Sequence, residues 1–170
     1  MQPVDIIIPV YGALDSVREC ISSVEASELP STTRVMIYDD ATNDVELSSY
    51  LRAVATQHPG RFYVRTNHEN KGFAATVNAA VNLYTSHDII ILNSDACVPR
   101  TWVEKLQQCA YKSMDVGTVT PLTNNGTLAS FPVLGREQSL PLGFKYQDVD
   151  TALGIANRDV VLEIPTAVGF

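Results

Sequence analysis

Short apolar runs alternate with apolar residues at helical spacing, and this alternation restricts the fold of the chain more than any other feature. A continuous apolar run at 5–10 predicts a buried strand, and further runs rich in apolar and β-branched residues predict strands at 35–38, 62–65, 88–92, 116–120 and 160–164. Helix-spaced apolar residues follow the first run at Leu14, Val17, Ile21 and Val24, and similar stripes follow the next three runs. Strands that alternate with helices predict an α/β fold with a mostly parallel sheet and right-handed crossovers.

The segment 121–145 interrupts the alternation, because turn-forming Asn, Pro and Gly residues are frequent there. A loop of this length inside a compact domain is usually functional or disordered. A short helix is expected at 149–156, before the last predicted strand. The chain 1–170 as a whole is expected to form a single domain.

The composition excludes several classes of function. The chain is 45% hydrophobic, which is enough for a buried core, and its net charge of −7 argues against nucleic acid or an anionic membrane as its main partner. No apolar run approaches the ~18 residues of a membrane-spanning helix, and we expect no transmembrane segment in this chain and no signal peptide. The three cysteines match no zinc pattern, and they fit a reducing, cytoplasmic compartment.

Acidic residues follow two of the predicted strands. Asp39 and Asp40 come after the second apolar run, and Asn93, Ser94 and Asp95 come after the fourth. In a parallel α/β sheet the ligand crevice lies outside the carboxyl ends of the strands. A carboxylate can accept the imide N–H of uracil or thymine, and a hard divalent cation takes oxygen ligands. These loops therefore predict a nucleotide with a divalent cation; the alternative is that Asp and Thr here are helix N-caps.

Proline and tyrosine residues end the first predicted strand. Pro9 can stop the strand ladder, Val10 follows it, and Tyr11 could lie flat against a heterocyclic base. A tyrosine at the edge of the core is an equally good interpretation of Tyr11. The loop is a candidate for nucleobase binding only because the other polar loops also follow strands.

The loop after the third predicted strand contains Asn70, Lys71 and Gly72. Gly72 allows a positive φ or a close backbone approach, and Lys71 could offset phosphate charge. Asn70 can cap the following helix, which contains Asn78. A capped helix start with a solvated lysine is the alternative interpretation.

Four segments, in this order and spacing, resemble the inverting glycosyltransferases of family 2. They are 7–11 (IIPVY), 38–42 (YDDAT), 70–78 (NKGFAATVN) and 92–95 (LNSD). The resemblance covers essentially the whole chain, and it implies the GT-A fold, a Rossmann-like sheet flanked by helices in three α/β/α layers. The segments 121–125 and 164–170 also resemble a bacterial surface-polysaccharide branch of that family.

The resemblance implies a role for each matching position. The implied nucleotide-sugar-binding residues are Pro9, Val10, Tyr11, Asp39, Asp40, Asn70, Lys71, Gly72, Asn78, Asn93 and Ser94. Among them Asp40 would contact the base of the donor. Asp95, in the family's DxD-like segment, would bind Mg²⁺ or Mn²⁺, whereas Asn93 stands where many members have a second Asp.

The resemblance also implies a part that this chain does not supply. Family members carry a catalytic Asp or Glu base in a later, acceptor-binding half, and Asp148, Asp150 and Glu163 match no such motif. We therefore expect a truncated GT-A domain, the donor-binding part of a larger enzyme whose base lies after Phe170. If the missing half normally covers 160–170, a homodimer contact there is expected instead.

The expected function is transfer of a sugar, with inversion, from a UDP- or dTDP-linked donor to a saccharide or lipid-linked acceptor. The resemblance implies cell-surface polysaccharide synthesis in the cytoplasm, or at the inner face of the membrane. Two alternatives stay open: a nucleotide-sugar-binding module without catalysis, and a nucleotidyltransferase, although the loop 9–13 has only one glycine for a phosphate loop. A receiver-type domain would carry its acidic pair after the first strand, and a plain α/β domain would use the acidic residues as caps.

Overall fold

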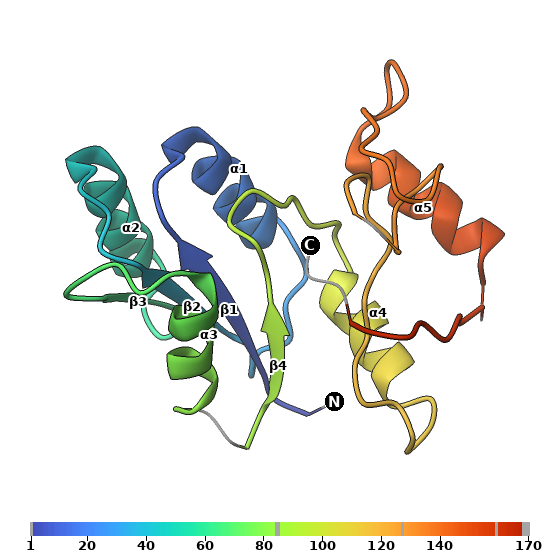
Figure 1. The fold of residues 1–170 in the computed structure, drawn as a ribbon, viewed down its shortest axis with the longest axis horizontal. Helices are drawn as coiled ribbons and strands as arrows, with labels where there is room; N and C mark the ends of the chain where they lie inside the picture. Colours follow the sequence, from blue (N-terminus) through green and yellow to red (C-terminus); the bar gives the residue numbers. More distant parts are fainter. Residues whose placement is uncertain (1, 84–85, 127, 159, 168–170) are drawn as a thin grey trace. The chain divides into compact units, whose positions relative to one another are not determined.

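The computed structural model describes residues 2–83, 86–126, 128–158 and 160–167 (Figure 1). Two compact units make up the chain. The first comprises Met1–Ser22 and Pro30–Ala96, and the second comprises Ser23–Leu29 and Cys97–Phe170. The sheet and all of the predicted binding residues belong to the first unit.

The first unit contains a parallel sheet of four strands. They are β1 (Val4–Val10), β2 (Arg34–Asp39), β3 (Phe62–Thr66) and β4 (Asp88–Ile91), in the order β3-β2-β1-β4. The first four predicted strands are thus confirmed. Every residue of β1 is buried, as expected for a central strand with both faces covered.

The strand order places a topological switch point between β1 and β4. The chain builds the sheet outward from β1 to β2 and β3, and then returns to add β4 on the other side of β1. β1 pairs with β2 as far as Val10, but its pairing with β4 ends at Ile7 and Ile91. The two strands therefore diverge toward their carboxyl ends, which is where ligands bind in open α/β sheets.

Within the described ranges, five helices accompany the sheet in sequence. They are α1 (Leu14–Glu25), α2 (Val45–Gln57), α3 (Phe73–Val81), α4 (Trp102–Ala110) and α5 (Tyr146–Ala156). Ala80 of α3 packs against Ile7, Met36 and Tyr38, and Figure 1 draws α3 in front of these strands. Their neighbours along the strands point to the opposite face, where right-handed crossovers place α1 and α2. The first unit is therefore layered α/β/α, as predicted.

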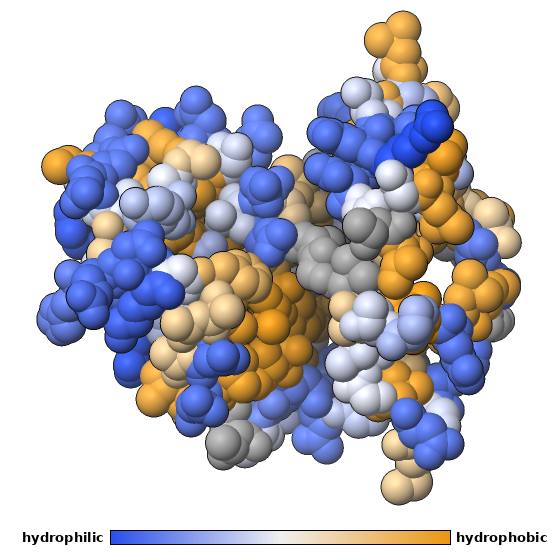
Figure 2. Space-filling view, viewed as in Figure 1, coloured by the Kyte–Doolittle hydropathy of each residue, from blue (hydrophilic) through white to orange (hydrophobic). Residues whose placement is uncertain are grey.

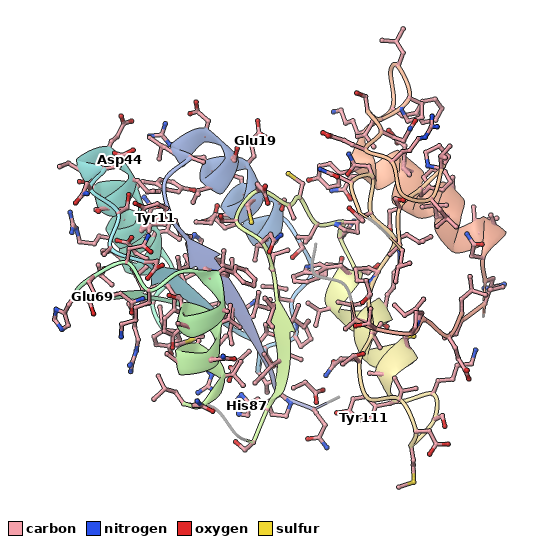
Figure 3. All side chains as sticks on the ribbon, viewed as in Figure 1. Tyr11, Glu19, Asp44, Glu69, His87 and Tyr111 are labelled. Carbon is pink, nitrogen blue, oxygen red and sulfur yellow. The ribbon has the colours of Figure 1, made fainter. Side chains whose placement is uncertain are left out.

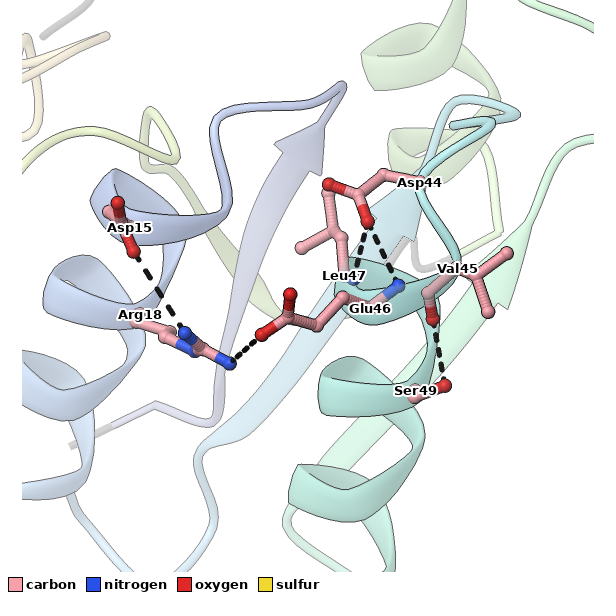
Figure 4. Close-up of polar contacts among 7 residues, drawn as sticks. All are labelled: Asp15, Arg18, Asp44, Val45, Glu46, Leu47 and Ser49. Atoms are coloured by element: carbon pink, nitrogen blue, oxygen red, sulfur yellow. Dashed lines mark hydrogen bonds and ion pairs between the residues drawn. The ribbon is translucent and has the colours of Figure 1, made fainter.

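Polar contacts at the surface connect α1 with α2 (Figure 4). Arg18 Nη2 donates to Glu46 Oε1 at 2.8 Å, and the guanidinium lies 5.4 Å from the centre of the Tyr50 ring. The side chain of Asp44 caps α2 by accepting from the backbone N–H groups of Glu46 and Leu47. Such exposed ion pairs contribute little stability, so the cap and the buried helix faces hold these elements in place.

A buried ion pair lies at the amino ends of the strands, opposite the predicted site. Asp5 is fully buried on β1, and Arg34 donates to it twice, from Nε to Oδ1 and from Nη2 to Oδ2, each at 2.7 Å. His87 Nδ1 lies 3.2 Å from Oδ1, and Figure 3 places His87 at this end. Burial alone would raise the pKa of Asp5, but the hydrogen bonds from Arg34 and His87 outweigh it and lower the pKa below its ordinary value.

Two strand predictions are wrong. The segments 116–120 and 160–164 are described, and neither forms a strand. Residues 160–164 are all exposed, whereas 116–120 are half-buried or exposed. In the described part of the second unit the only strand-like pairing is an isolated bridge between Thr123 and Ser130. Their β-branched residues favour a strand, but the described residues offer neither segment a ladder partner that would satisfy its backbone.

The remaining predictions for the second unit hold in outline. Apart from that bridge, 121–145 has no helix or strand among its described residues, as predicted. α5 begins at Tyr146, three residues before the predicted 149, and Lys105 of α4 donates to Asp150 of α5 at 2.7 Å. Of the family-like segment 164–170, residues 168–170 lie outside the described residues. No helix in the described residues is long and apolar enough to cross a membrane.

Candidate functional site

Backbone hydrogen bonds continue past the strand ends and join the loops at the carboxyl edge of the sheet. The N–H of Asp40 donates to the carbonyl of Val10, and the N–H of Asn67 donates to the carbonyl of Asp39, both at 2.8 Å. The loops after β1, β2 and β3 are therefore fixed to one another directly beside the switch point. This arrangement gives the polar residues of the three loops a rigid support.

The carboxylate of Asp40 is the centre of this edge. Asp40 is only 4% exposed. Its Oδ1 accepts from Asn67 Nδ2 at 2.6 Å, from the N–H of Lys71 at 2.9 Å and from Thr76 Oγ1 at 2.9 Å, and its Oδ2 accepts from the N–H of Gly72 at 2.8 Å. One side chain at the end of β2 thus holds the end of β3 and the start of α3.

These contacts decide the charge state of Asp40. Burial alone would raise its pKa, but the hydrogen bonds from the Lys71 and Gly72 backbones and from Asn67 and Thr76 outweigh burial and lower the pKa below its ordinary value of 3.8. Asp40 is therefore ionised at neutral pH. Because four donors already use its carboxylate, the role for Asp40 that these contacts directly support is organisation of the loop.

The neighbouring Asp39 has a different environment. It is 2% exposed, and its Oδ1 accepts from the N–H of Thr42 at 2.9 Å, the one hydrogen bond to this carboxylate within the described residues. Neither Asp39, Asp40 nor Thr42 caps the following helix, because the N-cap of α2 is Asp44. The capping alternative for the acidic pair is therefore wrong, and Asp39 keeps acceptor capacity that the fold does not use.

Positive φ angles show how tightly these loops turn. Gly72, with φ +78°, turns the chain into α3, whereas Ala41, with φ +61°, adopts the left-handed region without being glycine. An alanine there is strained by the contact between its Cβ and the following carbonyl.

Replacing Ala41 with glycine is expected to raise the free energy of unfolding by about 0.5–1 kcal/mol, because relief of the strain exceeds the entropy that glycine adds to the unfolded chain. Denaturant unfolding measures the change. As a matched control, Ala53→Gly in exposed helical sequence of α2 should lower the same free energy by about 0.8–1 kcal/mol. A loss of stability in Ala41→Gly would show that Ala41 is not strained.

The β1 loop presents an aromatic ring at the same edge. Pro9 and Val10 are buried within β1, and Tyr11, which follows directly, is 62% exposed. Figure 3 places Tyr11 at the end of the sheet to which the strand arrows point, with Glu69 of the β3–α3 loop at that end also. The core-edge alternative for Tyr11 does not fit this exposure, and the ring is available to a ligand.

The β3–α3 loop contributes polar groups in two ways. Asn70 Oδ1 accepts from the N–H of Gly72 at 3.1 Å, so Asn70 stabilises the turn, although the N-cap position itself is Gly72. Lys71 gives its backbone N–H to Asp40 and leaves its side chain exposed. Asn78 is exposed on α3, and no hydrogen bond within the described residues ties its side chain to the other candidates.

The β4 loop carries the candidate metal ligand. Asn93 and Ser94 are half-buried and Asp95 is exposed, with no hydrogen bond or ion pair to its carboxylate in the described part of the chain. Asp95 does not cap the next helix, because the N-cap position of α4 is Thr101. The carbonyl of Asn93 accepts from Cys20 Sγ at 3.4 Å, which anchors the loop to α1.

The oxygen atoms of this loop fit a divalent cation that is coordinated partly by the protein and partly by a phosphate group. No group of three or more His, Cys, Asp or Glu side chains that could hold a metal occurs among the described residues. One free carboxylate is nevertheless enough for Mg²⁺ or Mn²⁺ when a diphosphate supplies further oxygens. Figure 2 shows hydrophilic side chains over the β3–α3 loop, so this edge of the sheet suits a polar ligand.

The sequence did not identify Asn67 and Thr76, two residues that the structure adds to this edge. Asn67 lies in the polar stretch that follows β3, and Thr76 is a fully buried polar residue on the inner face of α3. The available signal was the hydroxyl of Thr76 among apolar helix positions, since a buried hydroxyl needs a hydrogen-bond partner.

Comparison with protein families gives one match. The sequence model of the family described as "Glycosyl transferase family 2" matches residues 5–154, which include every candidate residue named above. None of the curated protein sequences compared with the chain matches it significantly.

Solved structures share the fold. The mannosyltransferase PcManGT from Pyrobaculum calidifontis, solved with GDP-Man and Mn²⁺, has a TM-score of 0.60 and 23% identity, over 65% of this chain and 33% of that chain. S. aureus TarS 1–349, one structure of which contains UDP-GlcNAc, has a TM-score of 0.54 and 16% identity, over 74% of this chain and 40% of that chain. The GT-A fold is thus confirmed, and this chain spans less than half of either protein.

Proposed function

Because this chain belongs to glycosyl transferase family 2, we propose that its first unit binds the nucleotide-diphosphate sugar of a glycosyltransferase reaction. One observation carries the proposal: the loops after all four parallel strands bring their polar residues to the same sheet edge, at the switch point beside β1. Nucleotides bind at such edges in open α/β sheets. Tyr11, Asp39, Lys71 and Asp95 are the residues that we propose touch the donor.

We assign the nucleobase contact to Asp39 and the support of the loop to Asp40. Asp39 has one hydrogen bond to its carboxylate among the described residues, whereas Asp40 accepts four. Uracil and thymine each present one imide N–H to such an acceptor, which favours a UDP- or dTDP-linked sugar. Tyr11 is exposed beside this loop and can stack on the base.

The phosphate end of the donor is proposed to lie near the β4 loop. Asp95 would hold Mg²⁺ or Mn²⁺, with Ser94 and Asn93 beside it and the exposed Lys71 side chain offsetting further charge. When bound, the cation would offset the negative charge of the leaving diphosphate. The N–H groups of Lys71 and Gly72 would not bind phosphate, because Asp40 already accepts from both.

The remaining features of the activity are also proposals. We propose inverting transfer to a saccharide or lipid-linked acceptor in bacterial cell-surface polysaccharide synthesis, with the catalytic base outside the described residues. Inversion in one step requires a base to take the proton of the acceptor hydroxyl. The three cysteines are odd in number and irregularly spaced, which fits a cytoplasmic location, with a lipid-linked acceptor met at the inner face of the membrane.

Substitution of Asp95 tests the proposal. Asp95→Ala is expected to weaken Mn²⁺-dependent binding of the preferred nucleoside diphosphate at least about tenfold, because even outer-shell partners of a metal change affinity 10- to 100-fold. Asp115→Ala removes another exposed carboxylate and should leave affinity unchanged. Equal affinities in wild type and Asp95→Ala would contradict the metal assignment. Release of free sugar or transfer to an acceptor would separate an enzyme from a binding module.

Association of two copies is proposed for the last described segment. Val160, Val161, Leu162 and Ile164 are all exposed there. Contiguous apolar side chains of this kind favour association. Light scattering should therefore show a dimer that Leu162→Asp dissociates, and a wild type that stays monomeric at high concentration would rule out this contact.

A further inference from the structure

We infer that Asn67 and Thr76 are positioning residues of the donor site, which act on the ligand through Asp40. They hold its carboxylate, and the carboxylate in turn holds the loop that carries Asn70 and Lys71. The inference rests on the proposed function of this edge as a donor site. It adds two residues that the sequence motifs do not single out for binding.

The hydroxyl of Thr76 makes two hydrogen bonds in one small network. It donates to Asp40 Oδ1 at 2.9 Å and accepts from Asn67 Nδ2 at 3.0 Å. The same amide of Asn67 donates to Asp40 Oδ1 at 2.6 Å. The three side chains come from α3, from the end of β3 and from the end of β2, so the network joins elements that are distant in sequence.

Two neighbouring backbone groups depend on the orientation of this carboxylate. The N–H of Lys71 donates to Oδ1 and the N–H of Gly72 donates to Oδ2, so each oxygen faces its own amide. Without Thr76 and Asn67, Oδ1 would lose two of its three donors, and the carboxylate could rotate about its side-chain torsions. The loop would then sample orientations that do not present Asn70 and Lys71 to a ligand.

The side-chain N–H and O–H donors of both residues are already used inside the protein. Thr76 is fully buried, and Asn67 is half-buried with both of its described side-chain contacts inside the protein. An effect of their substitution on donor affinity must therefore pass through the geometry of the loop. Such preorganisation strengthens binding, because the free protein already holds the bound conformation.

The test compares substitutions at Thr76. Thr76→Val keeps the shape and removes the hydroxyl, Thr76→Ser keeps the hydroxyl, and Asn67→Ala serves as a second variant in case Thr76→Val does not fold. Thr33→Val is the matched control, because Thr33 is 2% exposed and its hydroxyl has no hydrogen-bond partner among the described residues. Each protein is titrated with UDP, dTDP and GDP in the presence of Mn²⁺, well below its melting temperature. Amide exchange at Lys71 and Gly72 is measured in parallel.

We expect Thr76→Val and Asn67→Ala to exchange faster at both amides and to bind about tenfold more weakly, because binding must then order the loop, at a cost comparable to immobilising one side chain. Thr76→Ser and Thr33→Val should retain wild-type affinity. Faster exchange with unchanged affinity would overturn the inference and leave a merely structural network. A wild type that binds none of the nucleotides would overturn the proposed function first, and the inference with it.

Discussion

Replacing Asp40 with alanine is expected to lower the free energy of unfolding by at least about 3 kcal/mol, because each hydrogen bond to a buried charge contributes about 1.5–3 kcal/mol. Four donors, from Asn67, Lys71, Gly72 and Thr76, would lose their acceptor at once. Denaturant unfolding at neutral pH measures the change. The loop after β3 would also lose its support, so donor binding should disappear in any variant that still folds.

A matched substitution shows whether the effect belongs to this site. Asp15→Ala also removes one carboxylate, but the side chain of Asp15 is 98% exposed and should contribute less than about 0.5 kcal/mol. If Asp40→Ala and Asp15→Ala lowered the free energy of unfolding by similarly small amounts, the hydrogen bonds to Asp40 would not be what stabilises these loops.

The stability of the wild type should depend on pH in the acidic range for the same reason. The pKa of Asp40 and that of Asp5 are both lower in the folded protein than the ordinary value of 3.8. For a carboxyl group with a depressed pKa, the unfolded chain takes up protons first as the pH falls, so stability is lost on acidification. The contribution is complete above about pH 5 and declines below the ordinary value, through the folded pKa. Asp40→Ala should flatten this part of the profile.

Replacing Arg34 with methionine should be the second large change, with a loss of about 3 kcal/mol or more, the usual result when one partner of a buried ion pair is removed. Asp5 is fully buried, and His87 would be its one remaining partner among those described. The substitution lies at the amino ends of the strands, opposite the candidate site. Donor affinity should therefore stay unchanged in the folded variant.

The acid dependence of Arg34→Met distinguishes this cause from a general loss of packing. Without Arg34, burial should raise the pKa of Asp5, so the folded variant binds a proton more readily than its unfolded chain. Its deficit relative to wild type should then shrink as the pH falls below about 5. The double variant Asp5→Leu, Arg34→Met removes both charges and should recover most of the loss, since apolar replacements of buried ion pairs are often neutral. A deficit independent of pH would contradict this account.

The sheet could be predicted from the sequence only where apolar runs and pairing partners coincide. Runs such as Ile6–Ile8 of β1 are buried on both faces, and the order of strands and helices follows from their alternation. The runs at 116–120 and 160–164 are also rich in β-branched residues, yet they do not form strands. Whether a run joins a ladder depends on a free neighbouring edge elsewhere in the fold, and local composition does not record that.

The candidate site could be located from the sequence, but the roles within it could not. Asp39, Asp40 and Asp95 lie at strand ends because the apolar runs before them end there, as predicted. The difference between Asp39 and Asp40 comes from Asn67 and Thr76, which are 27 and 36 residues away from Asp40. Contacts over such separations arise from the crossover β2-α2-β3-α3 and leave no local pattern.

The helix caps show a similar limit on a smaller scale. Several residues between Asp39 and Asp44 have side chains that favour an N-cap, and Asp44 takes the position. The choice depends on where α2 begins, which a sequence defines only within a few residues. That small shift matters, because it frees the acidic pair of Asp39 and Asp40 from a capping role.

One measurement tests the central claim most directly: calorimetric titration of the wild-type protein with UDP, dTDP and GDP, each with and without Mn²⁺. The guanine of GDP also presents a ring N–H, together with an exocyclic amino group, so titration with GDP tests whether Asp39 prefers a pyrimidine base. The account predicts that UDP or dTDP binds, that binding requires the metal, and that GDP binds more weakly. Failure of all three diphosphates to bind, with Mn²⁺ present and the protein folded, would contradict a donor site at the carboxyl edge of this sheet.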